Sequence, residues 1–151
     1  MYKRIKDLRE DNDYSQEYIS KFLGCSRSNY AMCESGDVKI SIEQLVKLAD
    51  IYHTNTDYLL GLTNSKCQGD AVIPYDKEKV AHNIRILRKE RNLSQSFLSA
   101  NVLNCTQSSY SQYETGKRTV NVDTIVSLAK FYNVRVDFLI GRIETPLIEL
   151  F

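Results

Sequence analysis

The sequence predicts an all-α protein built from two tandem domains of five helices each. Three observations support this fold class. The chain repeats itself at an offset of about 80 residues. Apolar residues recur at the three-and-four spacing of helices, without the alternation of strands. Serine, threonine, asparagine and glycine stand where helices would begin and end. We expect the domains at 1–63 and 76–143, with a linker over 64–75 and an apolar C-terminal tail over 144–151.

The internal repeat is clearest in two matched segments. The segment 15–36, SQEYISKFLGCSRSNYAMCESG, returns as 94–116, SQSFLSANVLNCTQSSYSQYETG, with one extra residue within 100–104. The segment 45–61, LVKLADIYHTNTDYLLG, returns as 125–141, IVSLAKFYNVRVDFLIG. The match predicts a tandem duplication of a unit of about 60 residues.

The first two helices of the first unit follow from apolar spacing and caps. Ile5 and Leu8 give an apolar stripe to a polar helix that ends near Asn12. Ser15 is a suitable N-cap for the second helix, and Gly24 can end that helix in the left-handed conformation. The residues expected on its inner face are Ile19, Phe22 and Leu23.

The other three helices of the first unit have equally clear signals. Ser26 caps a third helix that closes at Gly36. Ser41 and Gln44 form a capping box that opens the fourth helix. The apolar positions of that helix are Ile42, Leu45, Leu48, Ala49 and Tyr52. A short fifth helix is expected over 57–60, before Gly61.

The second unit repeats this scheme after a segment in which Gly69 and Pro74 break regularity. Asp76 is expected to cap its first helix. The residues in the matching roles are Ile84, Leu87, Ser94, Thr106, Asn121 and Gly141. In the tail, Leu147, Ile148, Leu150 and Phe151 would pack back onto the second unit, with a dimer contact as the alternative.

Composition narrows the functional class only slightly. Hydrophobic residues make up 42% and charged residues 26% of the chain, which is typical of soluble proteins. No apolar run reaches the roughly 20 residues of a membrane span, and the charged N-terminal segment MYKRIKDLRE does not resemble a signal peptide. We therefore expect a cytoplasmic protein without membrane contact.

The net charge of +1 gives weak support for a nucleic-acid partner. Residues 1–66 hold nine basic against ten acidic residues, and residues 67–151 hold eleven against nine.

No constellation for catalysis or metal binding stands out. No cysteine belongs to a CxxC pair, and His53 and His82 have no ligand-like spacing to any cysteine, so no metal site is expected. Cys25, Cys33 and Cys105 are interpreted as buried small hydrophobic residues, and Cys67 as an incidental exposed thiol. The chain also lacks a glycine-rich phosphate loop. The sequence therefore predicts a protein that is not an enzyme, with no cofactor and no evident small-molecule ligand.

Several spaced features agree in both units and point to one family. The first unit has Arg9, Ser15-Gln16, Gly24-Cys25-Ser26, Glu34-Ser35-Gly36 and Leu45–Ala49. The second has Arg88, Ser94-Gln95, Asn104-Cys105-Thr106, Glu114-Thr115-Gly116 and Ile125–Ala129. Each unit resembles the phage-repressor and Xre-type helix-turn-helix family, whose domains are lambda-repressor-like. The resemblance covers about four fifths of the chain and implies binding to the major groove of double-stranded DNA.

The resemblance also implies roles for individual residues. The helices Arg27–Glu34 and Gln107–Glu114 would be the recognition helices. The residues expected at base edges are Arg27, Ser28 and Met32 in the first unit, and Gln107, Ser108 and Gln112 in the second, with Asn29 near the groove wall. The residues expected at phosphates are Gln16, Gln95, Lys39, Lys117 and Arg118. The alternative for the residues expected at base edges is an ordinary solvated polar surface, and the alternative for Gln16 and Gln95 is a simple role in the capping turn.

Two further sets of residues are expected to be structural. An acid in the last turn of a helix needs a compensating cation. The family resemblance implies Arg9 as the partner of Glu34 and Arg88 as the partner of Glu114, and each pair would clamp the first helix of its unit to the third. Tyr30 and Tyr110 would be core anchors whose hydroxyl groups could reach a phosphate.

The sequence therefore predicts a sequence-specific DNA-binding transcriptional regulator that acts as a repressor. Two units on one chain would act as a covalent pseudo-dimer with recognition helices roughly 34 Å apart and unlike half-sites. A homodimer that uses one unit from each chain is the alternative arrangement. The alternative function is a protein-interaction or antitoxin-like module, in which Met32 and Asp37 mark a first unit that has lost DNA contact.

Overall fold

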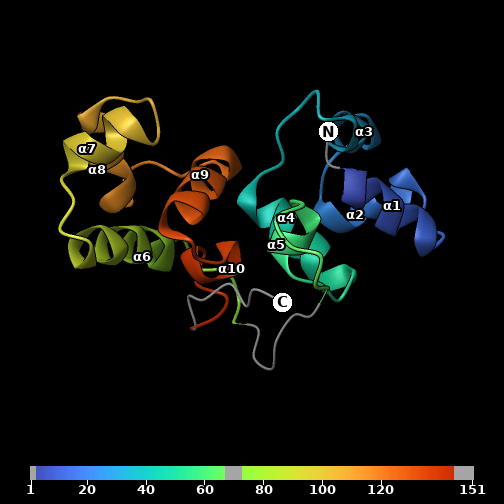
Figure 1. The fold of residues 1–151 in the computed structure, drawn as a ribbon. Helices are drawn as coiled ribbons and strands as arrows, with labels where there is room; N and C mark the ends of the chain where they lie inside the picture. The colour runs from blue at the N-terminus through green and yellow to red at the C-terminus, as the bar shows by residue number, and fades with distance from the viewer. Residues whose placement is uncertain (1–2, 67–72, 145–151) are drawn as a thin grey trace. The chain divides into compact units, whose positions relative to one another are not determined.

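The computed structural model describes residues 3–66 and 73–144, and the chain divides into two compact units, Met1–Asp70 and Ala71–Phe151 (Figure 1). The described residues form ten α-helices and no strand, which confirms the all-α prediction. None of these helices is long and apolar enough to cross a bilayer. The predicted domain boundaries at 63 and 76 stay a prediction. Cys67, much of the expected linker, and the apolar tail from Thr145 onward lie outside the described residues.

The first unit contains five helices, as predicted. They are α1 (Lys3–Asp11), α2 (Gln16–Leu23), α3 (Arg27–Ser35), α4 (Ile42–Ile51) and α5 (Thr56–Leu59). The side chains of Ser15, Ser26 and Ser41 each accept a hydrogen bond from the backbone N–H three residues on, and Ser41 forms the predicted capping box with Gln44. The fifth helix begins one residue earlier than predicted, because Asn55 caps it through the Tyr58 N–H.

The second unit repeats this order. Its helices are α6 (Lys77–Glu90), α7 (Gln95–Asn101), α8 (Gln107–Glu114), α9 (Val122–Tyr132) and α10 (Val136–Leu139). The predicted caps Asp76, Ser94, Thr106 and Asn121 all accept a backbone N–H at their helix starts. Helix boundaries in both units are therefore determined largely by local side-chain hydrogen bonds.

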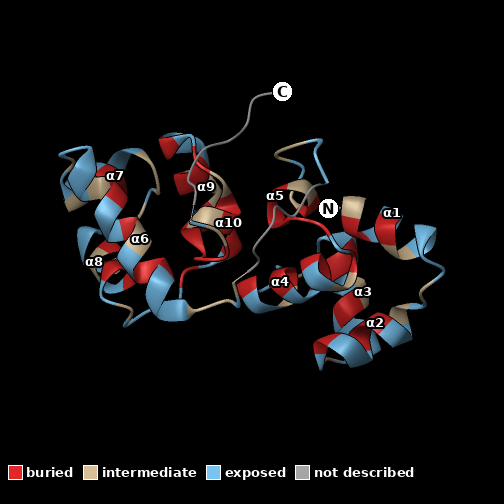
Figure 2. Cartoon of the chain, turned by 90° about the horizontal axis from the view of Figure 1, so that it is seen from below, coloured by how far each residue is buried: buried red, intermediate tan, exposed pale blue. Residues whose placement is uncertain are grey.

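The helices of each unit enclose a small apolar core, and the longer helices have buried residues along one side and exposed residues along the other (Figure 2). Ile19 and Leu23 are buried on α2 as predicted, but Phe22 is 44% exposed, so its assignment to the inner face was wrong. The buried stripe of α2 is completed by Ser20, whose hydroxyl donates to the Glu17 carbonyl and so does not need water. The buried side of α2 is therefore formed by Ile19, Ser20 and Leu23, and Phe22 lies outside it.

The cysteines also differ in part from the prediction. Cys33 on α3 is buried as predicted, and burial raises the pKa of its thiol. Cys25 and Cys105 are only half-buried, because both lie in the exposed turns that precede α3 and α8. Among the described residues, no group of three or more histidine, cysteine or acidic side chains could hold a metal ion.

Candidate nucleic-acid interface

The turn between α2 and α3, and the one between α7 and α8, present the third helix of each unit on a compact helix pair. Gly24 ends α2 with a φ of 74°, which costs glycine little, and Ser26 Oγ then accepts from the Asn29 N–H at 3.1 Å. In the second unit the longer turn uses Asn104 at a φ of 48°, and Thr106 Oγ1 accepts from the Ser109 N–H at 3.1 Å. In both turns the N-cap of the next helix follows two residues after a left-handed residue.

The side chains expected at base edges lie on the exposed first turns of these helices. Arg27, Ser28 and Asn29 are exposed at the start of α3, and Met32 is 45% exposed one turn further on. Gln107, Ser108 and Gln112 are exposed at the matching positions of α8. In each unit the side chains expected at base edges are therefore exposed on a single helix, α3 or α8. Their contact with bases stays a prediction.

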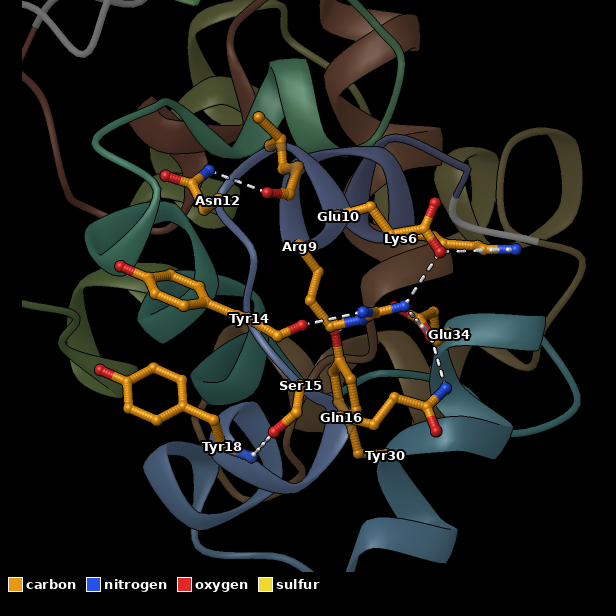
Figure 3. Close-up of polar contacts among 11 residues, drawn as sticks. Lys6, Arg9, Glu10, Asn12, Tyr14, Ser15, Gln16, Tyr18, Tyr30 and Glu34 are labelled. Atoms are coloured by element: carbon orange, nitrogen blue, oxygen red, sulfur yellow. Dashed lines mark hydrogen bonds and ion pairs between the residues drawn. The ribbon is translucent and has the colours of Figure 1, made fainter.

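A buried carboxylate holds α3 to its neighbours in the first unit (Figure 3). Arg9 Nε donates to Glu34 Oε1 at 2.7 Å, and Gln16 Nε2 donates to Oε2 at 2.8 Å. Glu34 is only 4% exposed. Burial alone would raise the pKa of Glu34, but the hydrogen bonds from Arg9 and Gln16 outweigh it and hold the pKa below its ordinary value. The predicted clamp between Arg9 and Glu34 is confirmed.

The second unit builds the same clamp with tighter geometry. Arg88 Nε lies 2.6 Å from Glu114 Oε1, and its Nη2 lies 3.0 Å from Oε2, so the pair is bidentate. Arg88 Nη1 also donates to the Leu93 carbonyl at 2.8 Å. Burial opposes ionisation of Glu114, yet the donors Arg88 and Gln95 lower its pKa. The predicted Arg88–Glu114 clamp is confirmed as well.

The tyrosines Tyr30 on α3 and Tyr110 on α8 are core residues. Tyr30 is 1% exposed and its hydroxyl donates to Glu34 Oε1 at 3.3 Å, while Tyr110 has no exposed surface. Burial raises the pKa of both phenols. The prediction of core anchors is right. The suggestion that their hydroxyl groups reach a phosphate is wrong, because both rings lie inside their unit.

Gln16 and Gln95 have an inward partner that the sequence analysis missed. Each donates its side-chain N–H to the buried glutamate of its own unit, at 2.8 Å in both cases. The recurrence of the Gln–Glu pair in both units could have suggested this contact. Backbone N–H groups at the start of α2 and α7 remain suited to a phosphate, and that role stays a prediction.

In the second unit the hydrogen bonds continue out to the exposed surface of α8. Gln107 Nε2 donates to Gln95 Oε1 at 2.8 Å. Because the Glu114 carboxylate can only accept, Gln95 must turn its N–H₂ inward and its oxygen outward. Gln107 therefore donates one side-chain N–H to Gln95, and its side-chain oxygen and second N–H are left for groups other than Gln95. The chain from Arg88 to Gln107 thus fixes the orientation of an exposed amide.

The turns after α3 and α8 differ in charge. In the second unit, Lys117 and Arg118 are exposed, and the Arg118 backbone N–H donates to the Gln112 carbonyl at 3.1 Å. The guanidinium of Arg118 lies 5.6 Å from the centre of the Tyr113 ring and 3.5 Å from Ser109 Oγ, and so directly beside α8. In the first unit, Asp37 takes the position of Lys117 and accepts from Ser35 Oγ at 2.6 Å, with Lys39 exposed nearby in the chain. Of these two turns, only the one after α8 carries basic side chains without an acidic one.

Comparison with known proteins identifies both units. A helix-turn-helix family model matches residues 5–59 and again residues 84–139. The HTH-type transcriptional regulator AnsR of Bacillus subtilis is 40% identical over 63 residues, which are 42% of this chain and 54% of that protein. The prophage-derived HTH-type transcriptional regulator YonR of the same organism is 33% identical over 70 residues, 46% of this chain and 65% of its own length.

A phage protein is also similar. The cryptic phage CTXphi transcriptional repressor RstR of Vibrio cholerae is 38% identical over 66 residues, 44% of this chain and 59% of that protein. The chain therefore spans between 54% and 65% of the length of these three relatives. No solved structure matches the chain.

Proposed function

This chain belongs to the Xre-type helix-turn-helix family of transcriptional regulators, and from that premise we propose that it binds double-stranded DNA sequence-specifically. In this proposal α3 and α8 enter the major groove, and the protein represses transcription. The observation that carries it is the ordered amide of Gln107, held by Gln95 and the buried Arg88–Glu114 pair at the surface of α8. The likeness to RstR, which is named as a repressor, supports repression as the direction of control.

The two recognition surfaces suit different bases. An amide that keeps its oxygen and one N–H can form two hydrogen bonds with adenine, whereas the arginine at the start of α3 suits the two acceptors of guanine. Met32 can only contact a thymine methyl group or exclude a base. We therefore propose an asymmetric site with unlike half-sites, in which Gln107 and Gln112 read one half and Arg27 reads the other.

The contacts to phosphate are proposed to be stronger in the second unit. Lys117 and Arg118 would each neutralise a phosphate, and Gln95 would lie near another at the start of α7. The corresponding turn of the first unit offers Lys39 but also Asp37, which repels phosphate. Binding should therefore depend more on the second unit.

Selection of sites from random DNA, with the full chain at a stated salt concentration, tests the proposal. We expect one enriched sequence with two unlike halves. Arg27→Ala should relax base preference in one half and Gln107→Ala in the other, each by about 1–3 kcal/mol of discrimination. Recovery of perfect palindromes would instead favour a homodimer with one unit of each chain on DNA. Absence of any enrichment would contradict sequence-specific binding.

A second candidate function has one observation in its favour. Met32 and Asp37 give the first unit a recognition surface that is less suited to DNA, so this unit could instead contact a protein, as in an antitoxin-like module. Affinity of the full chain for its selected site distinguishes the two. If Arg27→Ala and Lys39→Ala leave affinity unchanged while Lys117→Ala and Arg118→Ala weaken it, the first unit does not contribute to DNA binding and the second candidate gains support.

A further inference from the structure

Two exposed phenylalanines of the second unit lie against each other. Phe97 on α7 is 41% exposed, Phe131 on α9 is 40% exposed, and their ring centroids are 6.3 Å apart. The buried ring of Tyr132 meets Phe131 edge to face, with centroids 5.0 Å apart. We call Phe97 and Phe131 the phenylalanine pair. Apolar side chains grouped at a surface are characteristic of contact sites.

Basic side chains border the phenylalanine pair. Arg91 Nη2 donates to the Tyr132 carbonyl oxygen at 3.3 Å, so its guanidinium lies at the end of α9, one residue beyond Phe131. Lys130, which precedes Phe131, is exposed. Within residues 3–66 and 73–144, no carboxylate forms an ion pair with Arg91 or Lys130. The surface beside the rings therefore offers two cations to an acidic group from outside.

The first unit has an aromatic residue at the same place but the opposite charge around it. Tyr18 aligns with Phe97 in the repeat and is 50% exposed. Residues 10–13 hold three acidic side chains and no basic one, whereas the matching residues 89–92 hold two basic side chains and one acidic. Asp50 likewise stands where the second unit has the lysine of α9. Because both units form the same five helices, the fold does not require basic residues at these positions.

The phenylalanine pair is built from residues other than those of the candidate DNA surface. The side chains expected at base edges lie on α8, whereas the pair joins α7 to α9. A phenylalanine ring has no donor for a phosphate oxygen, and contacts to phosphate are made by polar and basic groups. Two adjoining rings beside cations therefore suit a protein partner better than a DNA duplex, since aromatic residues and arginine are enriched where proteins meet.

We propose that the phenylalanine pair and its basic border bind a segment of a partner protein in which an apolar side chain stands between acidic residues. The apolar side chain packs on the rings of Phe97 and Phe131, and the carboxylates pair with Arg91 and Lys130. Charge selects an acidic segment, because the same cations repel a basic one. The contact goes beyond the proposed function and can be measured without DNA.

Selection from a library of random peptides, with the full chain as bait, tests the proposal. We expect the enriched peptides to combine an apolar residue with several acidic ones. The dissociation constant of the most enriched peptide, made synthetically, should rise with salt concentration. It should also rise at least about 10-fold in Phe97→Ser/Phe131→Ser. Ile86→Ser is the matched control, because Ile86 is also an exposed apolar residue but lies on α6, and it should leave binding unchanged.

A second variant tests the charges without touching the rings. Arg91→Asn/Lys130→Asp gives the second unit the residues that the first unit has at these positions, so it should remain folded, and thermal melts of each variant check this. We expect it to weaken binding of the acidic peptide at least about 10-fold, because one cation is lost and the other becomes an acid.

Several results would overturn the proposal. They are the absence of any enriched peptide, enrichment of peptides without acidic residues, and binding that both double variants retain. Loss of peptide binding in Tyr18→Ser/Phe22→Ser alone would assign the contact to the first unit. A change in the sedimentation of the free chain in the phenylalanine variant would make a second copy the occupant. Displacement of the peptide by double-stranded DNA, together with weaker DNA binding in Arg91→Asn/Lys130→Asp, would assign the basic border to phosphate.

Discussion

The buried pair of Arg88 and Glu114 allows a quantitative prediction for Glu114→Gln. This change keeps the size of the side chain but removes its charge. Arg88, whose side chain is 15% exposed, would then lose its bidentate partner and remain largely desolvated. Breaking a buried ion pair on one side costs about 3–5 kcal/mol, and the retained amide contacts favour the lower end of that range. We therefore expect the second unit to lose about 3 kcal/mol of stability.

Thermal unfolding followed by circular dichroism measures this loss. For a domain of this size, a change of this magnitude lowers Tm by roughly 12–24 °C. Glu90→Gln is the matched control, because Glu90 is an exposed glutamate on α6 and its loss should change stability by less than about 0.5 kcal/mol. The double variant Arg88→Met/Glu114→Gln should recover part of the loss, because no unpaired charge then remains buried.

The reasoning would be refuted by either of two results. One is a Glu114→Gln protein that melts within a few degrees of the wild type, as the Glu90→Gln control should. The other is a double variant whose loss equals the sum of the two single losses, since this would mean that the two side chains do not interact.

Three further predictions concern pH, DNA contact and backbone conformation. The folded pKa values of Glu34 and Glu114 lie below the ordinary value of a glutamate, so their contribution to stability is fully present above that ordinary value and is lost as pH falls through the folded pKa. An acid titration should therefore show a shallower loss of stability for Glu34→Gln/Glu114→Gln than for the wild type. Arg118→Ala should weaken binding to all DNA sequences alike and reduce the salt slope by about 1, whereas a change in base preference would contradict a phosphate contact. Gly61 and Gly141 both have a φ of 76°, but a Cβ at Gly141 would lie 2.7 Å from the Lys79 Cβ while one at Gly61 meets nothing within 4 Å. Gly61→Ala should therefore lower the free energy of unfolding by about 1–2 kcal/mol, because alanine is strained at this φ. Gly141→Ala should lower it by about 1–3 kcal/mol more, because the new Cβ also meets Lys79. Chemical denaturation measures both losses, and equal losses would show that the contact with Lys79 is relieved without cost.

The sequence by itself determined the helices and the clamps of this protein. The capping box of Ser41 and Gln44 spans only four residues, so its hydrogen bonds can be inferred without knowledge of the rest of the fold. The pairs Arg9–Glu34 and Arg88–Glu114 join distant residues, and they were predictable only because the repeat and the family resemblance matched both partners twice.

Only the tertiary structure decided which edge of each helix is buried and which amides meet. Phe22 and Ser20 both flank the apolar residues of α2, and the packing of neighbouring helices buries the serine and exposes the phenylalanine. The contact of Gln107 with Gln95 likewise depends on how α8 crosses α7 and on a carboxylate brought in from the end of α8. Local hydrogen bonds are specified by a few consecutive residues, whereas the orientation of a side chain toward another helix is specified by the packing of the whole unit.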